Sequence, residues 1–572
     1  MRHRVPLIIG LVTLCVASAC GTGGGTKDRN SAGFADCDPH PNTCNTTRVK
    51  PGGTFVVAIE KKLPNWNTFD SDGNTFEAGQ VVAGIAPAPF PVLPDSSVSW
   101  NRHLFAAEPQ ETTGGQGAAM TVVLKVRPEA VWNDNTPIGA QDFVYLWRSS
   151  NGRDCPGCTA AATAGYDAIS AITGSDNDKT VTLTFSRPFP DWRSLFTNLY
   201  PAHVARKAGD LSTPDGLKAA FDAFKTTQPT WSGGPYRITD VVPDVSITLV
   251  PNDRWYGSVK PTLEKLVFKI LEDQPQQVPA LRNKEVHALT SQPNGDMIAE
   301  VKKLTGVNYR LAKGPNWEHI DANTRNRWLA DPVLRRAIFT AIDRKEILDK
   351  TVGTFFDAAE LLNNHSIMPG SPGYRDVVTP TGQGSGDIGR AQSILREAGY
   401  KLDGGKLFTK DGQQVAPLRF RFTAGNQLRQ QTAELIQIRL RQIGVEITID
   451  PTDRLGRTLD SGDFDLALFG WVGTSFLADK KDLWTTGGGG NYGEYSNPQV
   501  DALINQAVET FDDAQARELF NRADELMTAD AYNLPLFQKA VFLAVYSEYG
   551  NVRNNPTSSG PLYNCEEWGI RE

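Results

Sequence analysis

Strand and helix patterns alternate through almost the whole chain, and this order limits the fold to the α/β class. Residues 432–444 (TAELIQIRLRQIG) have the apolar spacing of a helix and end at a glycine, and VEITID follows with the alternation of a strand. A helix that leads directly into a strand is typical of α/β units. The sequence contains no repeat of 20 to 50 residues, which excludes a solenoid.

Further segments carry the same two signals. Strands are predicted where β-branched and apolar residues gather, at 52–60, 120–128, 179–190, 246–252 and 263–271. Helices are predicted at 140–150, from Asp331 through DPVLRRAIFTAIDRKEIL, from Asn497-Pro498 and at 512–527. Because 572 residues exceed what one core normally supports, we expect two or three lobes, with the chain crossing between them more than once.

The N-terminus has the features of an export signal. Arg2 and Arg4 precede an apolar run at 5–17 that is too short to span a bilayer with ease, and Ala17-Ser18-Ala19-Cys20 resembles a bacterial lipobox. This predicts a signal peptide at 1–19, lipidation of Cys20 and a flexible tether at 20–50, which anchor the protein to the cell membrane on its extracytoplasmic face. The alternative is an ordinary secretory signal with a chance cysteine.

Cysteine spacing predicts two local disulfides. Outside the cytoplasm thiols tend to oxidise, so Cys37 is expected to pair with Cys44 and Cys155 with Cys158, which leaves Cys565 as a free thiol. CPGC at 155–158 is also compatible with a redox motif, or with half of a metal site completed by Cys37 and Cys44. It lies in an Ala/Gly/Thr-rich loop rather than at a helix start that would lower a thiol pKa, so we expect disulfides and no metal.

Composition and motifs favour a binding protein over an enzyme. The net charge of −7 argues against a nucleic-acid partner, whose binding surface would be basic. The seven histidines are scattered singly, and the sequence has no H-E-x-x-H, G-x-S-x-G or phosphate-loop motif. We therefore expect no catalytic residues and no cofactor.

Six ordered stretches resemble one family, the peptide-type substrate-binding proteins of ABC importers. They are MTVVLKVRPEAVWNDNTPIGAQDFVYLWR, SGGPYRI with LVPNDRWYGSVKPTLEKLVFKI, DPVLRRAIFTAIDRKEI, RAQSILREAGY, QIRLRQIGVEITI and FDLALFGW. In the first stretch Trp132, Asn133 and Asn135 replace commoner family residues. The resemblance covers residues 51 to 548 and rests on the series rather than on any one motif.

The resemblance implies a periplasmic-binding-protein-like fold with a ligand cleft between two lobes. It places the first lobe at 51–95, 230–318 and 530–572, an extra subdomain of that lobe at 96–229, and the second lobe at 319–529. Several crossings between lobes would form a hinge that closes on the ligand.

The segment FGWVGTSF (469–476) is predicted to line this cleft. By resemblance, backbone groups of Gly470 and Val472 pair with a peptide ligand as if it were an added strand, and Trp471 forms an aromatic wall. Gly470 and Gly473 favour this interpretation because they permit close approach. The alternative is that Trp471 is a core residue closing a strand.

Thr474 occupies the position where the family commonly has an Asp that binds the peptide α-ammonium. A hydroxyl cannot neutralise a buried positive charge. Either Glu60, Asp70 or Asp72 supplies the carboxylate, or the ligand has no free amine there.

Further site candidates lie in two polar loops and in one stretch between the lobes. They are Trp66, Asn67, Asp70 and Asn74 in LPNWNTFDSDGNTF, Tyr492 and Tyr495 in NYGEYSN, and Asn316 with Trp317. The alternative for the first loop is a solvated turn, and for the second a glycine-rich surface loop.

Together these features predict a monomeric, lipid-anchored protein that captures oligopeptides and delivers them to ABC permease subunits. Within the fold, the alternatives are capture of a sugar, opine or metal chelate. Outside transport, they are a peptide-sensing lipoprotein or an extracellular hydrolase.

Overall fold

The computed structural model describes residues 32–114 and 118–572. The predicted signal peptide, the lipidated Cys20 and the first part of the tether lie outside the described residues. Over the described ranges, no helix combines the length and apolar character needed to cross a bilayer.

A ten-stranded mixed sheet runs through the molecule in the order β15-β14-β16-β11-β17-β10-β2-β9-β8-β7. Its outer strands are β2 (Thr54–Ile59), β7 (Tyr236–Val242), β8 (Ser246–Pro251), β9 (Lys265–Ile270) and β10 (Ala288–Leu289) at one end, and β14 (Leu418–Arg421), β15 (Ile447–Ile449) and β16 (Leu466–Trp471) at the other. Apolar side chains of these strands, including Phe55 and Leu466, are fully buried, as their sequence pattern predicts.

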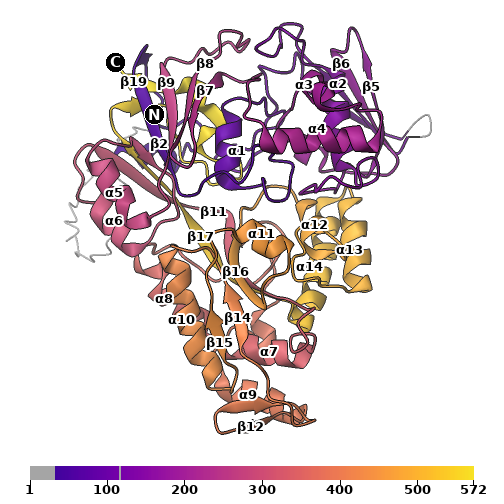
Figure 1. Ribbon diagram of the computed structural model, residues 1–572, viewed down its shortest axis with the longest axis vertical. Coiled ribbons are helices and arrows are strands. Elements are labelled where there is room, and N and C mark those ends of the chain that lie inside the picture. Colours follow the sequence, from indigo (N-terminus) through magenta and orange to yellow (C-terminus); the bar gives the residue numbers. More distant parts are fainter. Residues whose placement is uncertain (1–31, 115–117) are drawn as a thin grey trace, which may run out of the picture.

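Two long strands join the lobes. β11 (Val307–Ala322) and β17 (Asn533–Tyr546) pair antiparallel along almost their whole length, and their register shifts between Lys313 and Trp317. Figure 1 shows both strands passing from the broad upper part of the molecule into the narrower lower part. The predicted two-lobe α/β fold is therefore confirmed.

Helices cover the sheet in both lobes. Those of the first lobe are α1 (Phe76–Ala83), α5 (Gln274–Arg282) and α6 (Gly295–Val301). Those of the second lobe are α7 (Pro332–Ala341), α8 (Arg344–Lys350), α9 (Ile388–Glu397), α10 (Gln427–Arg441), α11 (Leu455–Asp460), α12 (Asp479–Trp484), α13 (Pro498–Val508) and α14 (Asp513–Asp530). A small hairpin of β12 (Lys401–Asp403) and β13 (Lys406–Phe408) lies beside α9 at the far end of this lobe.

The helix predicted from Asp331 is two helices. Asp331 caps α7 as expected, by accepting a hydrogen bond from the amide of Val333. The chain then turns extended at Ile342, and Asp343 caps α8 by accepting from the amide of Glu346. A second capping carboxylate inside an apolar-periodic run was the signal for this break.

A separate four-stranded sheet, ordered β3-β4-β6-β5, lies beside the first lobe. It consists of β3 (Gln110–Thr113), β4 (Met120–Lys125), β5 (Ile169–Ser175) and β6 (Thr180–Phe185), with helices α2 (Ala140–Ser150), α3 (Ala202–Ala208) and α4 (Pro214–Thr226). All of these elements fall inside the range 96–229. The lobe limits remain a proposal. The proposed limit at 318/319 falls inside β11, a strand shared by both lobes.

The segment 32–50 is folded onto the body, so the prediction of a tether over 20–50 is wrong for these residues. The short helix η1 (Ala32–Cys37) buries Phe34 completely, and β1 (Val49–Lys50) pairs with β19 (Gly569–Arg571). The Arg553 guanidinium donates to the carbonyl of Cys44. A buried aromatic ring and sheet pairing hold this segment, which its composition alone did not indicate.

Both predicted disulfides are formed. Cys37 is bonded to Cys44 and Cys155 to Cys158, while Cys565 is a buried free cysteine. Asp36 is the third group beside Cys37 and Cys44 that offers a metal ligand. The disulfide consumes both thiols, so this group lacks the thiolates that a metal site needs.

Candidate ligand-binding site

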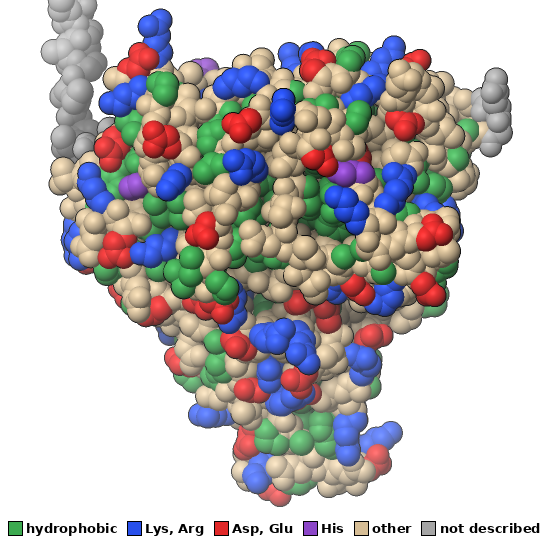
Figure 2. Space-filling model, turned by 45° about the horizontal axis from the view of Figure 1, so that its top comes forward, with side chains coloured by type: hydrophobic (Ala, Val, Ile, Leu, Met, Phe, Trp, Pro, Cys, Tyr) green, Lys and Arg blue, Asp and Glu red, His purple; other side chains and the backbone are tan. Residues whose placement is uncertain are grey.

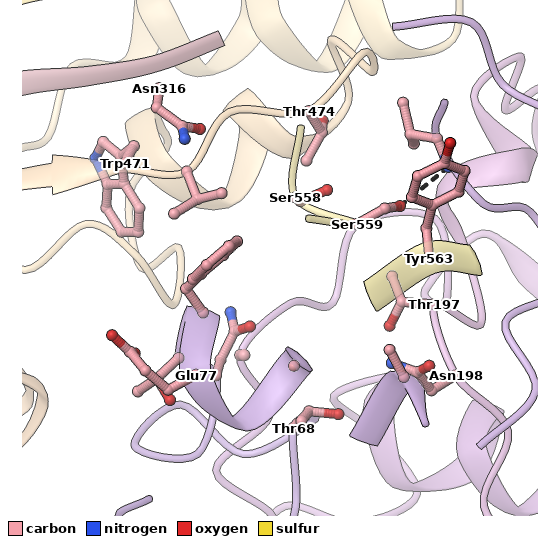
Figure 3. Close-up of a pocket in the computed structure, with 18 of the residues that line it drawn as sticks. Thr68, Glu77, Thr197, Asn198, Asn316, Trp471, Thr474, Ser558, Ser559 and Tyr563 are labelled. Atoms are coloured by element: carbon pink, nitrogen blue, oxygen red, sulfur yellow. Dashed lines mark hydrogen bonds between the residues drawn. The ribbon is translucent and has the colours of Figure 1, made fainter. Parts of the chain in front are cut away.

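A large cavity of about 1520 Å³ lies between the lobes. Its walls come from α1 and the loop after β2 in the first lobe, from the four-stranded subdomain, and from β16, α12 and the loop between them in the second lobe. Figure 3 shows α1 with Glu77 on one side and Asn316, Trp471 and Thr474 on the other. A volume of this size accommodates a ligand of several residues.

Contacts between the second lobe and the rest of the chain close the cavity. Asp482 of α12 accepts hydrogen bonds from the Thr163 hydroxyl and the Ala164 amide, at 3.2 Å each, across the boundary with the subdomain. Nearby, Asp191 accepts from the Ala478 amide at 2.8 Å. Such contacts between elements that belong to different lobes define a closed conformation.

Asp482 is buried against the subdomain, so we expect Asp482→Asn to favour the open conformation. The amide retains one acceptor oxygen but presents an NH₂ group to the donors of residues 163 and 164. Buried donors left without partners cost about 1–3 kcal/mol, or roughly fivefold to 150-fold in the closed-to-open ratio. Small-angle scattering of the ligand-free protein should show a larger radius of gyration.

Asp501→Asn is the matched control. Asp501 lies on α13 and accepts from the amide and hydroxyl of Thr486, which belongs to the same lobe. Its substitution should leave the radius of gyration unchanged. Equal scattering curves for Asp482→Asn and the wild type would contradict the assignment of Asp482 to closure.

Trp471 combines the two roles that the sequence left open. It lines the cavity, and its ring lies nearly parallel to those of Tyr492 and His319, at centroid distances of 5.8 and 6.0 Å. His319 is fully buried in the second lobe. Trp471 thus joins the cavity wall to the core of that lobe, and its indole Nε1 has no hydrogen-bond partner among the described residues.

Close approach at Gly470 and Gly473 is to the chain itself. A Cβ at Gly473 would lie 2.2 Å from the carbonyl oxygen of Pro315, and one at Gly470 would lie 2.9 Å from that of Trp317. Side chains at both positions would therefore collide with β11. Packing against this neighbouring strand explains both glycines, so they are not in themselves evidence of a nearby ligand.

Thr474 lies beside a carboxylate that the sequence did not identify as a candidate. Its hydroxyl donates to Asp479, the first residue of α12, and both residues line the cavity. Burial raises the pKa of the Asp479 carboxyl, and the Thr474 hydrogen bond opposes this shift. The next residue, Lys480, is 4% exposed, lines the cavity and forms no side-chain hydrogen bond or ion pair with the described residues.

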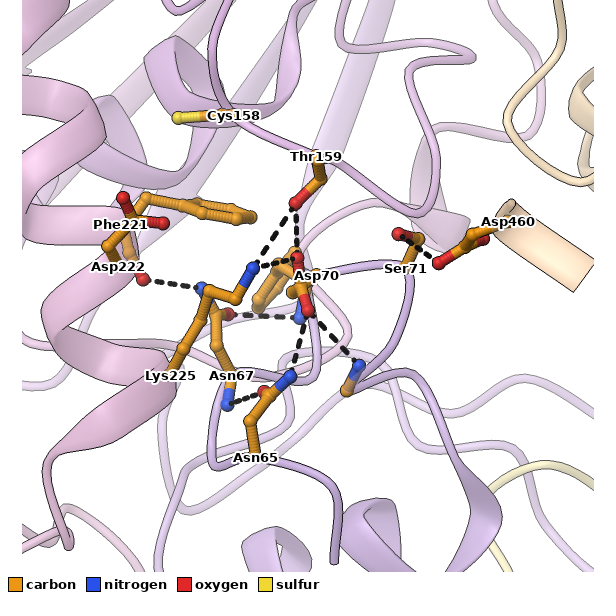
Figure 4. A network of polar contacts seen from close by, with 12 residues as sticks. Asn65, Asn67, Asp70, Ser71, Cys158, Thr159, Phe221, Asp222, Lys225 and Asp460 are labelled. Atoms are coloured by element: carbon orange, nitrogen blue, oxygen red, sulfur yellow. Dashed lines mark hydrogen bonds and ion pairs between the residues drawn. The ribbon is translucent and has the colours of Figure 1, made fainter. Parts of the chain in front are cut away.

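Three of the loop residues predicted to contact the ligand do not line the cavity. Asp70 is fully buried and accepts hydrogen bonds from Thr159 and Asn65 while forming an ion pair with Lys225 at 2.9 Å (Figure 4). The prediction for Asp70 is wrong because these contacts hold it inside the first lobe.

In the same loop, Asn67 and Trp66 also lie away from the cavity, whereas Asn74 lines it as predicted. Asn67 is buried and donates to the carbonyl of Phe221, and Trp66 packs against the core. Both contribute to the interior rather than to the cavity wall. Asn74 does line the cavity, as do Glu60 and Asp72, the other two carboxylates considered for an ammonium group.

The remaining candidates divide in the same way. Asn316 and Tyr492 line the cavity, whereas Trp317 is fully buried and Tyr495 is buried against Tyr532. Trp317 is the cross-strand partner of Trp471, but only Trp471 reaches the cavity.

An ionic centre at the cavity floor was missed by sequence reasoning. Glu318 of β11 is 1% exposed and forms ion pairs with Arg429 of α10 and, at 3.2 Å, with Lys539 of β17. These two cations hold the pKa of Glu318 at about 2, although burial alone would raise it. The three residues are far apart in sequence, and because β11 and α10 each carry several charged residues, no local pattern marked these three as partners.

Charged side chains of both signs are interspersed over the face of the molecule in Figure 2. The same view shows the broad upper part tapering to the lower lobe. A cavity between two lobes is a common location for a ligand-binding site.

Comparisons with known proteins agree with a ligand-binding role. Residues 117–494 match the family described as Bacterial extracellular solute-binding proteins, family 5 Middle. The oligopeptide-binding protein OppA of Mycobacterium tuberculosis is 30% identical over 558 residues, which cover 96% of this chain and 90% of OppA. The chain therefore belongs to the family 5 bacterial extracellular solute-binding proteins.

Two solved structures share the fold. The periplasmic EDTA-binding protein EppA is 33% identical with a TM-score of 0.85, over 93% of this chain and 99% of EppA. The oligopeptide-binding protein AppA from Bacillus subtilis, solved with a nonapeptide, is 19% identical with a TM-score of 0.79, over 92% of this chain and 100% of AppA. At that identity, AppA supports the fold alone.

Proposed function

We propose that this protein captures oligopeptides in the cavity between its lobes and delivers them to an ABC importer from the extracytoplasmic face of the cell membrane, to which the lipidated Cys20 anchors it. The observation that carries this proposal is an unpaired strand edge inside the cavity. β14 pairs with β16 only at Leu466 and Ala467, so the following residues have β11 on one side and no strand of the described chain on the other.

The unpaired edge suits the backbone of an extended peptide. The amide of Gly473 donates to Asn316 Oδ1 at 3.0 Å, toward β11. Successive amides of an extended strand point in opposite directions, so those of Val472 and Gly470 point away from β11. Val472 makes no backbone hydrogen bond with the described chain, and both residues line the cavity. A peptide bound there would continue the sheet.

Charges in the cavity suit a ligand with ionised ends. The Lys480 ammonium is available for a carboxylate, and Asp479 stands beside Thr474, where the family commonly has its ammonium-binding Asp. In this proposal, the contacting residues are Gly470, Trp471, Val472, Thr474, Asn74 and Tyr492, together with Asn316 and Lys480. The likeness to OppA across almost the whole chain supports a peptide as the ligand.

A metal chelate is the second candidate ligand. EppA is named as an EDTA-binding protein and is 33% identical to this chain. The unpaired Lys480 ammonium suits a polycarboxylate as well as a peptide carboxylate. A chelate, however, has no peptide backbone to pair with a strand, so the unpaired edge of β16 favours the peptide.

Titration calorimetry with pentaalanine and with magnesium–EDTA separates the two candidates. The proposal predicts measurable heat with pentaalanine and weaker or no binding of the chelate, because only the peptide can pair with β16. Tight chelate binding without peptide binding would replace peptide capture by chelate capture. Detergent partitioning of the mature protein, with its N-terminus at Cys20, checks the anchor independently.

A further inference from the structure

We propose that Glu77 of α1 binds a positively charged group of the ligand, either an ammonium or a guanidinium. This inference rests on the proposed function, since it specifies which peptides the cavity prefers. Glu77 lines the cavity and is only 4% exposed. Figure 3 shows it on the wall opposite Trp471 and Thr474.

Among the cavity carboxylates of the described chain, Glu77 is the one with a buried oxygen that lacks a hydrogen-bond partner. Its Oε2 is buried without a hydrogen-bond partner, and no cation lies within ion-pair distance of the side chain. By contrast, Asp482 accepts from residues 163 and 164, Asp479 accepts from Thr474, and Glu60 accepts from the amide of Gln292 at 2.9 Å. A buried carboxylate without a partner is costly, and a ligand cation would remove that cost.

The charges around Glu77 leave its carboxylate without an internal partner. Lys539 and Arg429 are basic residues at the cavity floor, both paired with Glu318, and Lys539 also donates to Gln292 Oε1. Burial raises the pKa of Glu77 above its usual value and Glu60 adds to this shift, while Lys61 and Lys539 lower the pKa without forming an ion pair with Glu77. No described cation therefore forms an ion pair with Glu77, and its Oε2 remains without a hydrogen-bond partner among the described residues.

Local structure fixes the position of Glu77. It lies in the first turn of α1, whose N-cap Thr75 accepts from the amide of Ala78. One turn further, Gln80 donates to the carbonyl of Ser559, and Val81 is fully buried. These contacts fix the position of α1 and therefore that of the Glu77 carboxylate, as ligand recognition requires.

The cationic group has two possible sources in a peptide: the α-ammonium or a lysine or arginine side chain. Two sets of alanine pentapeptides distinguish them. In one set, lysine or norleucine, which has nearly the same apolar stem, occupies each position in turn; in the other, the same peptides carry an acetylated N-terminus. Competitive capture followed by mass spectrometry gives relative affinities for the wild type, Glu77→Gln and Glu272→Gln.

Glu272→Gln is the matched control, because Glu272 also lines the cavity but is exposed, and its substitution changes the net charge equally. The wild type and Glu272→Gln should prefer one cationic peptide over its neutral partner by about thirtyfold or more. Glu77→Gln should reduce that preference to within about threefold. Without ligand, Glu77→Gln should melt no lower than the wild type, because the amide removes a buried charge while it keeps the shape.

The outcomes separate this inference from the proposed function. A preference for the free over the acetylated N-terminus identifies the α-ammonium as the bound group, and a preference for lysine over norleucine identifies a side chain. If the wild type retains peptides without a charge preference, or if the preference survives in Glu77→Gln, the role of Glu77 is overturned while peptide capture still stands. Retention of no peptide by the wild type would overturn peptide capture itself, and the role of Glu77 with it.

Discussion

Glu318→Gln is expected to lower the free energy of unfolding by about 3–5 kcal/mol, because it leaves the buried Arg429 and the partly buried Lys539 without their anion. Glu318 is 1% exposed, and both Arg429 and Lys539 depend on its carboxylate. The three side chains come from β11, α10 and β17, so the ionic centre ties the second-lobe helix to the strands that join the lobes. Urea denaturation at pH 7 measures the difference.

Glu285→Gln provides the control for the loss of an ordinary ion pair. Glu285 pairs with Lys269 at 2.7 Å, but its side chain is 49% exposed, and such pairs contribute about 0–1 kcal/mol. A loss below about 1 kcal/mol in Glu318→Gln, equal to that of the control, would contradict the structural importance of the ionic centre.

The same centre should make stability depend on pH. The pKa of Glu318 in the folded protein is about 2, below the usual 4.5. Because the folded-state value is the lower one, the stabilisation is fully present above about pH 4.5 and is lost as pH falls toward 2. The shift corresponds to about 3 kcal/mol. The difference in stability between the wild type and Glu318→Gln should accordingly shrink between pH 5 and pH 3.

Val472→Pro is expected to weaken peptide binding by about 2–4 kcal/mol, or roughly thirtyfold to a thousandfold. Proline removes the amide that points away from β11 and leaves a ligand carbonyl without its donor inside a closed cavity. The fold should tolerate the change, since that amide has no partner in the described chain and Val472 is 38% exposed. Calorimetry with pentaalanine gives the affinity, and thermal melting reports on the fold.

Val472→Ala is the matched control, because it trims the side chain but keeps the amide. Its affinity should stay within about threefold of the wild type. If proline and alanine weaken binding equally, the side chain rather than the backbone makes the contact. If neither has an effect while the peptide still binds, the ligand does not lie along β16.

Local sequence signals were sufficient for most of the fold. The helix at 140–150 has the predicted bounds, and the strand predicted at 246–252 is β8, because apolar period and capping residues act within one element. Folding of residues 32–50 onto the body was not predictable in this way. The short helix η1, which carries the buried Phe34, packs against β11 hundreds of residues further along the chain, and no local pattern in residues 32–50 reports such a contact.

The candidate site was predictable in part for the same reason. The position of FGWVGTSF at the cavity was predictable, because the end of a strand and the glycine-containing loop after it can both be recognised from neighbouring residues. Asp70 and Asn67 looked like ligand contacts because polar residues in a loop are usually solvated, yet their partners on α4 bury them. Glu77 was missed because a glutamate in the first turn of a helix is favoured by the helix dipole alone.

Native mass spectrometry of the wild type and Val472→Pro, each exposed to one tryptic peptide mixture, tests the central claim most directly. The account predicts that the wild type retains adducts which fragment as peptides, and that Val472→Pro retains few or none at the same concentration. A wild type that stays empty, or that carries an adduct without peptide fragments such as a metal chelate, would contradict peptide capture along β16.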